Sequence, residues 1–106
     1  MSNLQELAAL LSRATGAEAA VDRAVAECFD AARADYTASV TAARDLAVSV
    51  LPGWVFHIGY DASGMFPYAA MTRDDIHLEA AAPTVPLAIL RVAVAAKLRQ
   101  ESAPAP

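Results

Sequence analysis

The stretch LPGWVFHIGY, residues 51–60, decides the fold because the spacing of its apolar side chains differs from that of the residues before it. Upstream, apolar residues recur every three to four positions, as they do along one side of a helix. Pro52 disfavours helical geometry in the residue before it, so a helix is expected to end there. From Trp54 to Tyr60, large side chains occupy alternate positions, which is the period of a β-strand. The sequence therefore predicts a helical part followed by a sheet.

Two turn sequences downstream of Tyr60 divide the following residues into two further strands. DASG at 61–64 and TRDD at 72–75 contain residue types that favour turns. Apolar side chains alternate between the turns and after the second one, which predicts a three-stranded antiparallel meander over residues 54–81. Thr84 and Pro86 match the start of a final helix, predicted over 84–100. That helix is apolar around most of its circumference, so we expect it to pack on more than one side.

The helical part, residues 1–51, is predicted to contain three helices. Ser2 and Thr15 each precede a Gln or Glu by three residues and are expected to cap the first and second helices. Asp35 or Thr37 is expected to cap the third. Helices, then a meander, then a helix indicate one α+β domain over residues 1–100. At least the final helix should cover one face of the sheet, and whether helices cover the second face stays open. Residues 101–106 are expected to form a disordered tail.

Composition places the chain among cytoplasmic globular proteins. It has 106 residues, of which 57% are hydrophobic and 19% charged. It lacks both a run of about 18 apolar residues and a basic N-terminal region before an apolar one, so neither a membrane span nor a secretory signal is predicted. The single cysteine, Cys28, excludes an internal disulfide and fits a reducing compartment.

The charge distribution argues against nucleic-acid binding. The net charge is −4, the isoelectric point is about 4.9, and the Lys and Arg residues are scattered along the chain. Nucleic-acid binding needs clustered cations that neutralise phosphates. An acidic surface instead suits contacts with a protein partner, whose identity the sequence does not give. Self-association through the apolar C-terminal helix is a further alternative.

Motifs for catalysis and cofactor binding are missing from the sequence. The four glycines are isolated, so no phosphate-binding loop is present, and no nucleophile elbow occurs. Cys28 falls within the apolar stripe of a helix, which favours a buried structural thiol over a reactive one. We therefore predict no catalytic residue, no cofactor and no enzymatic activity.

His57, His77 and Glu79 form the strongest constellation of titratable groups. All three fall on the strand face opposite Trp54 and its neighbours. They would converge if the first and third strands were adjacent, but in a meander the middle strand separates these strands by about 9–10 Å. A metal site needs three or four convergent ligands. We therefore predict no metal, with these three residues as weak candidates, and interpret the histidines as half-exposed side chains on the more polar face.

The aromatic side chains of the predicted sheet allow two interpretations. Those at positions 54, 56, 60, 66 and 68 alternate as the core face of a sheet would. Alternatively, Trp54, Tyr60 and Tyr68 could surround a small ligand together with His57. The core interpretation is favoured, and the ligand site is kept as the alternative.

Four segments resemble one group of phage proteins. They are TGAEAAVDRAV (15–25), DYTASVTAA (35–43), LPGW (51–54) and APTVPLAILRVAVAA (82–96). Their order and spacing are similar to those of the phage ABA sandwich domain family, small prophage-associated alphaproteobacterial proteins of unknown function. The resemblance implies an α/β/α sandwich with the sheet between helices, and a phage or prophage origin. It implies no catalytic residues.

The sequence thus leads to two functional hypotheses. The first is a small acidic prophage-type protein without enzymatic activity that works through protein–protein contacts, as an accessory factor or as an inhibitor of a host system. The second is a small-ligand binder with an aromatic site on the sheet.

Overall fold

The structure, a computed structural model, describes residues 3–102 and has four helices and a three-stranded sheet in the predicted order. The α+β class is confirmed. In chain order the elements are α1 (Asn3–Arg13), α2 (Ala19–Phe29), α3 (Val40–Val50), β1 (Val55–Tyr60), β2 (Pro67–Arg73), β3 (Ile76–Ala81) and α4 (Val85–Ser102).

The sheet is the predicted antiparallel meander, in the order β1-β2-β3. Ile58 pairs with Ala69, which pairs with Ala80 on the other side, and the register continues in both directions from there. Because side chains alternate along each strand, this register places one apolar set on a single face. This inner face carries Phe56, Ile58, Ala69, Met71, Leu78 and Ala80, all of which belong to the core or pack against it.

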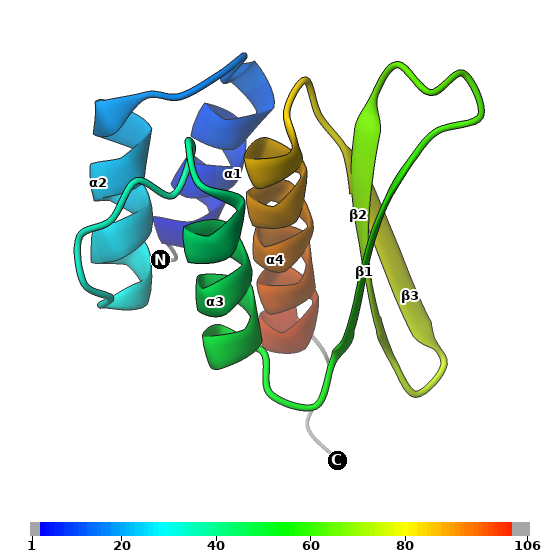
Figure 1. Cartoon of the computed structure of the whole chain (residues 1–106). Helices are drawn as coiled ribbons and strands as arrows, with labels where there is room; N and C mark the ends of the chain where they lie inside the picture. The colour runs from blue at the N-terminus through cyan, green and yellow to red at the C-terminus, as the bar shows by residue number, and fades with distance from the viewer. Residues whose placement is uncertain (1–2, 103–106) are drawn as a thin grey trace.

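Helix α4 occupies the centre of the molecule. It packs on β2 and β3 with one side, while α1 and α3 flank it and α2 packs on α1, farthest from the sheet (Figure 1). Residues on every side of α4 are buried, including Leu87, Ile89, Leu90 and Val92. The prediction that this helix packs on more than one side is therefore confirmed. The helix begins after Thr84, whose hydroxyl accepts from Leu87 N–H at 3.4 Å.

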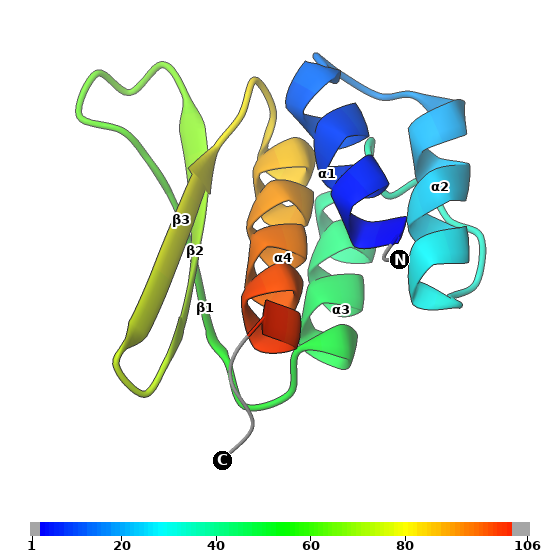
Figure 2. The ribbon, with the colours of Figure 1, turned by 180° about the vertical axis from the view of Figure 1, so that it is seen from behind.

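The sheet forms an outer layer and does not lie between helices as the resemblance implied. Figures 1 and 2 show, from opposite sides, that all four helices lie on one side of the sheet. The residues of β1 and β3 that point away from α4 include the exposed His57, His77 and Glu79. These polar side chains gain little from burial under a helix, so this face stays open.

Helix ends differ from the predictions where a distant residue caps them. Helix α2 has Glu18 at its N-cap without a side-chain capping bond, and Thr15 lies before the helix. The hydroxyl of the buried Thr37 accepts from Glu18 N–H at 2.8 Å and donates to Asp22 Oδ1 at 2.7 Å. Thr37 thus holds the start of α2 and does not cap α3, which Ser39 caps through Ala42 N–H at 3.1 Å.

The two chain ends were also part of the sequence predictions. The predicted cap at Ser2 lies outside the described residues, as do residues 103–106 of the predicted tail. Helix α4 continues to Ser102, so residues 101 and 102 are helical where a disordered tail was expected. No helix in residues 3–102 is long and apolar enough to cross a bilayer.

Two cations on α4 connect it to the ends of neighbouring helices. Arg91 Nε donates to Leu11 O at 2.9 Å, near the end of α1, and its other nitrogens reach further carbonyls. Lys97 Nζ donates to Val50 O at 3.1 Å, at the end of α3. The last carbonyls of a helix have no partner within the helix and carry partial negative charge. Both cations therefore satisfy groups that packing around α4 would otherwise leave unpaired.

Candidate functional site

The open face of the sheet is covered by no helix of residues 3–102 (Figures 1 and 2). We call it the outer sheet face. It carries the side chains that alternate with the inner set along all three strands: Val55, His57, Gly59, Tyr68, Ala70, Thr72, His77, Glu79 and Ala81. Of the four residues predicted for a ligand site, His57 and Tyr68 lie on this face, together with the weak metal candidates His77 and Glu79 of β3.

Tyr68 lies on the outer sheet face, where it is paired with Gly59 of β1 and lies beside His57. The two rings have centroids 5.9 Å apart and planes tilted by 45°. A Cβ atom at Gly59 would come within 2.9 Å of the Tyr68 ring, so the ring would have to shift if a larger residue replaced this glycine. The prediction that Tyr68 belongs to the core face is wrong, because Pro67, Ala69 and Met71 occupy the inner face of β2. Tyr68 and His57 are the only two of the four predicted ligand residues that the described structure brings together.

His77 lies in a short polar chain at the opposite edge of the outer sheet face. Thr72 Oγ1 is 2.9 Å from His77 Nδ1, and His77 Nε2 is 2.8 Å from Glu79 Oε2. The His77 and Glu79 side chains are 55% and 57% exposed, so their contact contributes about 1 kcal/mol at most. His57 is paired with Ala70, which separates it from Glu79. No group of three metal-binding side chains occurs within residues 3–102.

The turn between β1 and β2 presents large apolar side chains to solvent. Met65 is 72% exposed and Phe66 48% exposed, and we call these two residues the hairpin tip. Asp61 shapes the turn: its carboxylate accepts from Ser63 Oγ at 2.6 Å, and its carbonyl from Gly64 N–H at 2.9 Å. The hydrogen bond from Ser63 is the main cause of a lowered pKa for the Asp61 carboxyl. The tip is thus held by a hydrogen-bonded turn and is not a loose loop.

Trp54 and Tyr60 do not join His57 and Tyr68. They lie just before β1 and at its end, which places them about 20 Å apart along the strand. Tyr60 is 59% exposed. Trp54 is half-buried against the core beside α4. The four residues predicted for a ligand site therefore do not form one pocket.

Trp54 instead lines a separate cavity of about 400 Å³ between the β2–β3 turn and the end of α4. When the Gln100 amide is oriented to match its surroundings, its oxygen accepts from Trp54 Nε1 at 3.0 Å and from Arg73 at 3.1 Å. Asp74, Ile76 and Arg99 complete the walls. The indole of Trp54 and the aliphatic wall of Ile76 suit a small flat ligand. Two arginines outnumber the single carboxylate of Asp74, so an anion is favoured over a cation.

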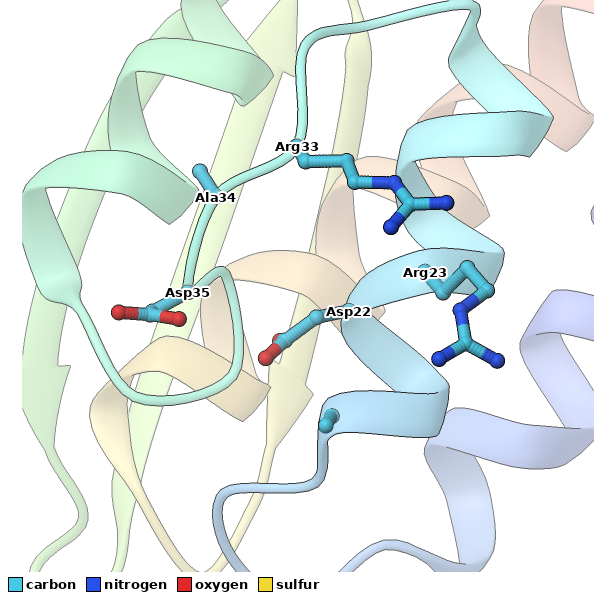
Figure 3. A pocket seen from close by; sticks show the side chains of 6 residues that line it. Asp22, Arg23, Arg33, Ala34 and Asp35 are labelled. Carbon is cyan, nitrogen blue, oxygen red and sulfur yellow. The ribbon is translucent and has the colours of Figure 1, made fainter.

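A second cleft of about 400 Å³ lies between α2 and the segment that precedes α3. Figure 3 shows the side chains of Arg23 and Arg33 on one side of the view, and Asp35 pointing away from them. Asp22 also lines the cleft, but its carboxylate accepts from both the main chain and the hydroxyl of Thr37. The charges of the two arginines and two aspartates cancel, so this cleft has no net preference for anions or cations.

Cys28 has the properties of a structural thiol. It is half-buried and packs against the core. Burial, followed by the negative charge of Glu101, raises its pKa above the ordinary thiol value of 9.0. A reactive cysteine requires the opposite shift, because the thiolate is the nucleophile.

Sequence reasoning missed the hairpin tip and the partners of Trp54. The tip had a detectable signal, since Met65 and Phe66 directly follow the turn sequence DASG, where polar residues are usual. Arg73 and Gln100 had none, because they are far from Trp54 in sequence. Comparisons with protein-family models, curated proteins and solved structures give no match for this chain. The resemblance to the phage ABA sandwich group therefore stays a prediction.

Proposed function

We propose that this protein acts through contacts with another protein, without an enzymatic activity of its own, and that the hairpin tip is its main anchor. The observation that supports this most directly is the exposure of Met65 and Phe66 at the end of a structured turn. Burying either side chain against a partner is favourable by roughly 1.5–3 kcal/mol if it becomes fully enclosed. Aromatic residues and methionine are enriched in interface cores for this reason.

The position of the histidines supports contact more than catalysis. His57 packs on Tyr68, and His77 is hydrogen-bonded to Thr72 and Glu79, all on an open sheet face. Catalytic groups typically lie in concave sites that exclude water. An open face with aromatic and polar side chains instead resembles the mixed surface of a protein interface.

Site-specific photo-crosslinking tests this proposal. A photoreactive amino acid replaces Met65 in one variant and Val48 in the other, since Val48 is also apolar and 54% exposed but lies on α3. In lysate of the organism that carries the gene, we expect one discrete adduct from position 65 and none from position 48. The double variant Met65→Ser/Phe66→Ser should lose capture of the same protein, whereas Val48→Ser should retain it. Equal crosslinking from both positions would contradict the proposal.

The resemblance to prophage proteins supports a narrower version of this proposal. The partner would then belong to a host system, and the protein would serve as its inhibitor or as an accessory factor. The net charge of −4 favours a basic surface on that partner. Identification of the crosslinked protein by mass spectrometry tests this version. A partner of phage origin, or one with an acidic binding surface, would overturn it.

The Trp54 cavity supports a second candidate, binding of a small flat anion. Trp54 is the only tryptophan, so its fluorescence reports directly on this site. Titration with benzoate, with benzamide as the uncharged control, should change the emission of the wild type for benzoate only. Arg73→Met should remove that response. Unchanged emission at millimolar benzoate would eliminate this candidate and leave the protein-contact proposal intact.

A further inference from the structure

Strand β1 is an edge strand with a row of unpaired main-chain groups. Asp61 N–H donates to Phe66 O at 3.0 Å, which fixes the pattern of the β1–β2 ladder. By antiparallel alternation, His57 and Gly59 bond to β2, while the N–H and C=O groups of residues 56, 58 and 60 point away from the sheet. No helix or strand in residues 3–102 pairs with that edge.

The side chains of β1 also lack a complete cover. Helix α4 packs on β2 and β3, so Phe56 and Ile58 on the inner face are only half-buried, and Tyr60 is exposed. Natural edge strands are usually protected by a charged residue, a proline or a bulge. Strand β1 contains no Lys, Arg, Asp, Glu or Pro, and its register with β2 is continuous. This edge is therefore open to pairing.

The opposite edge of the sheet is protected against pairing with itself. Ala82 N–H donates to Pro67 O, so the outward main-chain groups of β3 belong to His77, Glu79 and Ala81. An antiparallel pair of two β3 strands centred on Glu79 would place two carboxylates directly opposite each other. Like charges in that position are destabilising. Pairing between two copies is therefore disfavoured at the β3 edge and unopposed at the β1 edge.

We propose that β1 pairs antiparallel with β1 of a second copy of this chain, about a two-fold axis at Ile58. In this register Phe56 lies opposite Tyr60 of the second copy, and Ile58 lies opposite its own equivalent. Each of these pairs exchanges both N–H···O=C bonds, so the outward groups of both strands are satisfied. The two sheets become continuous, with the helices of both copies on the same side.

The chemistry of β1 favours a second copy over an unrelated strand. The outward groups of residues 56, 58 and 60 can all be paired by a second copy about a two-fold axis at Ile58. The half-covered Phe56 and Ile58 of both copies lie on the same face, so pairing covers them on both sides of the axis. Phe56 and Tyr60 also form aromatic cross-strand pairs, which are favourable. This inference does not rest on the proposed function, because Met65 and Phe66 lie beyond the paired segment.

Sedimentation of the full chain is the first test. The wild type should sediment as a dimer at micromolar concentration. Ile58→Lys places two like charges opposite each other at the axis and should give a monomer with an unchanged circular dichroism spectrum. The double variant Met65→Ser/Phe66→Ser should remain a dimer, which separates this inference from the proposed function. A wild type that stays monomeric up to millimolar concentration overturns the dimer.

Cysteine crosslinking tests the register even if Ile58→Lys fails to fold. In a Cys28→Ser background, Ile58→Cys places two thiols opposite each other, within the Cα separation of about 4.4–6.8 Å that disulfides require. The matched control is Val55→Cys, on the same strand and 69% exposed, whose two copies would lie about 20 Å apart. Mild oxidation should join Ile58→Cys at least about tenfold faster than Val55→Cys, because only the first meets the disulfide geometry. Equal rates, or a faster reaction at the more exposed Val55→Cys, would overturn the proposed axis.

Discussion

Replacing Arg91 with methionine should lower the free energy of unfolding by about 2–4 kcal/mol. The guanidinium group donates from Nε to Leu11 O at 2.9 Å and from its terminal nitrogens to Ala81 O at 2.9 Å, Ala14 O at 3.2 Å and Ser12 O at 3.3 Å. It thereby joins the end of α1, the end of β3 and α4. Methionine keeps most of the aliphatic stem, so this variant mainly removes the donors.

The size of the effect follows from the burial of each carbonyl. The bonds to Leu11 and Ala14 are partly buried, and leaving such an acceptor unpaired costs about 1–3 kcal/mol each. The carbonyls of Ser12 and Ala81 are bonded at exposed positions, where water can replace the arginine. Domains of this size unfold with about 5–15 kcal/mol. The loss of about 2–4 kcal/mol should therefore lower the melting temperature by roughly 8–32 °C, at about 4–8 °C per kcal/mol.

Urea denaturation followed by circular dichroism measures this loss. Arg23→Met is the matched control, because Arg23 is exposed and has no hydrogen-bond partner within residues 3–102. It should stay within about 0.5 kcal/mol of the wild type. Arg91→Lys keeps the charge but not the planar fork, so it should recover only part of the loss. An Arg91→Met variant as stable as Arg23→Met would refute the role assigned to these hydrogen bonds.

Three further predictions concern single side chains. Thr37→Val keeps the shape of a side chain that is 2% exposed but leaves Asp22 with fewer donors, so urea denaturation should show a loss of about 1–3 kcal/mol; an unchanged midpoint would contradict this. Ser63→Ala should raise the lowered pKa of Asp61 toward 3.8 in an NMR titration. Because this pKa is lowered in the folded state, the charged Asp61 carboxylate stabilises the fold above pH 3.8, and this stabilisation is lost as the pH falls through the folded pKa. A Ser63→Ala variant with the same titration curve as the wild type would contradict the role of the Ser63 hydrogen bond. Alkylation of Cys28 by iodoacetamide should require a higher pH than alkylation of glutathione, since burial raises the pKa of this thiol, and equal profiles would count against a structural thiol.

Local rules predicted the boundary between helices and sheet. Pro52 and Gly53 end α3 as expected, and Gly53 has φ of +89°, a conformation that other residues rarely adopt. Alternation from Trp54 onward then located β1 to within one residue. Thr84 located the start of α4 for the same reason, because its hydroxyl acts within one turn of the chain. Each of these signals involves residues that are close in sequence.

The sequence did not determine features that depend on distant residues or on register. Thr37 holds the start of α2 from 19 positions away, so the local cap pattern at Thr15 was misleading. The sequence pattern assigned Tyr68 to the wrong face of the sheet. The number of residues in the turn before β2 decides which alternate side chains of that strand point to the core, and the pattern did not give this number. A shift of one residue moves every side chain to the other face. The separation of Trp54 from His57 and Tyr60 follows from strand geometry, but its cavity with Gln100 requires the position of α4.

The side chains that join the helices to one another are buried on the inner side of the sheet, whereas the outer sheet face and the main-chain edge of β1 are available for contacts. On the helical side, α4 buries apolar residues around its circumference, and Arg91 and Lys97 satisfy the ends of α1 and α3. On the other side, no helix or strand of residues 3–102 packs on the outer sheet face or pairs with the edge of β1. Substitutions of exposed side chains on that face, such as Val55 and His57, should change association while leaving the monomer nearly as stable, because surface changes of this kind cost about 0.5 kcal/mol or less. This division makes the proposed contact surfaces testable without the unfolding that usually complicates variants of a small domain.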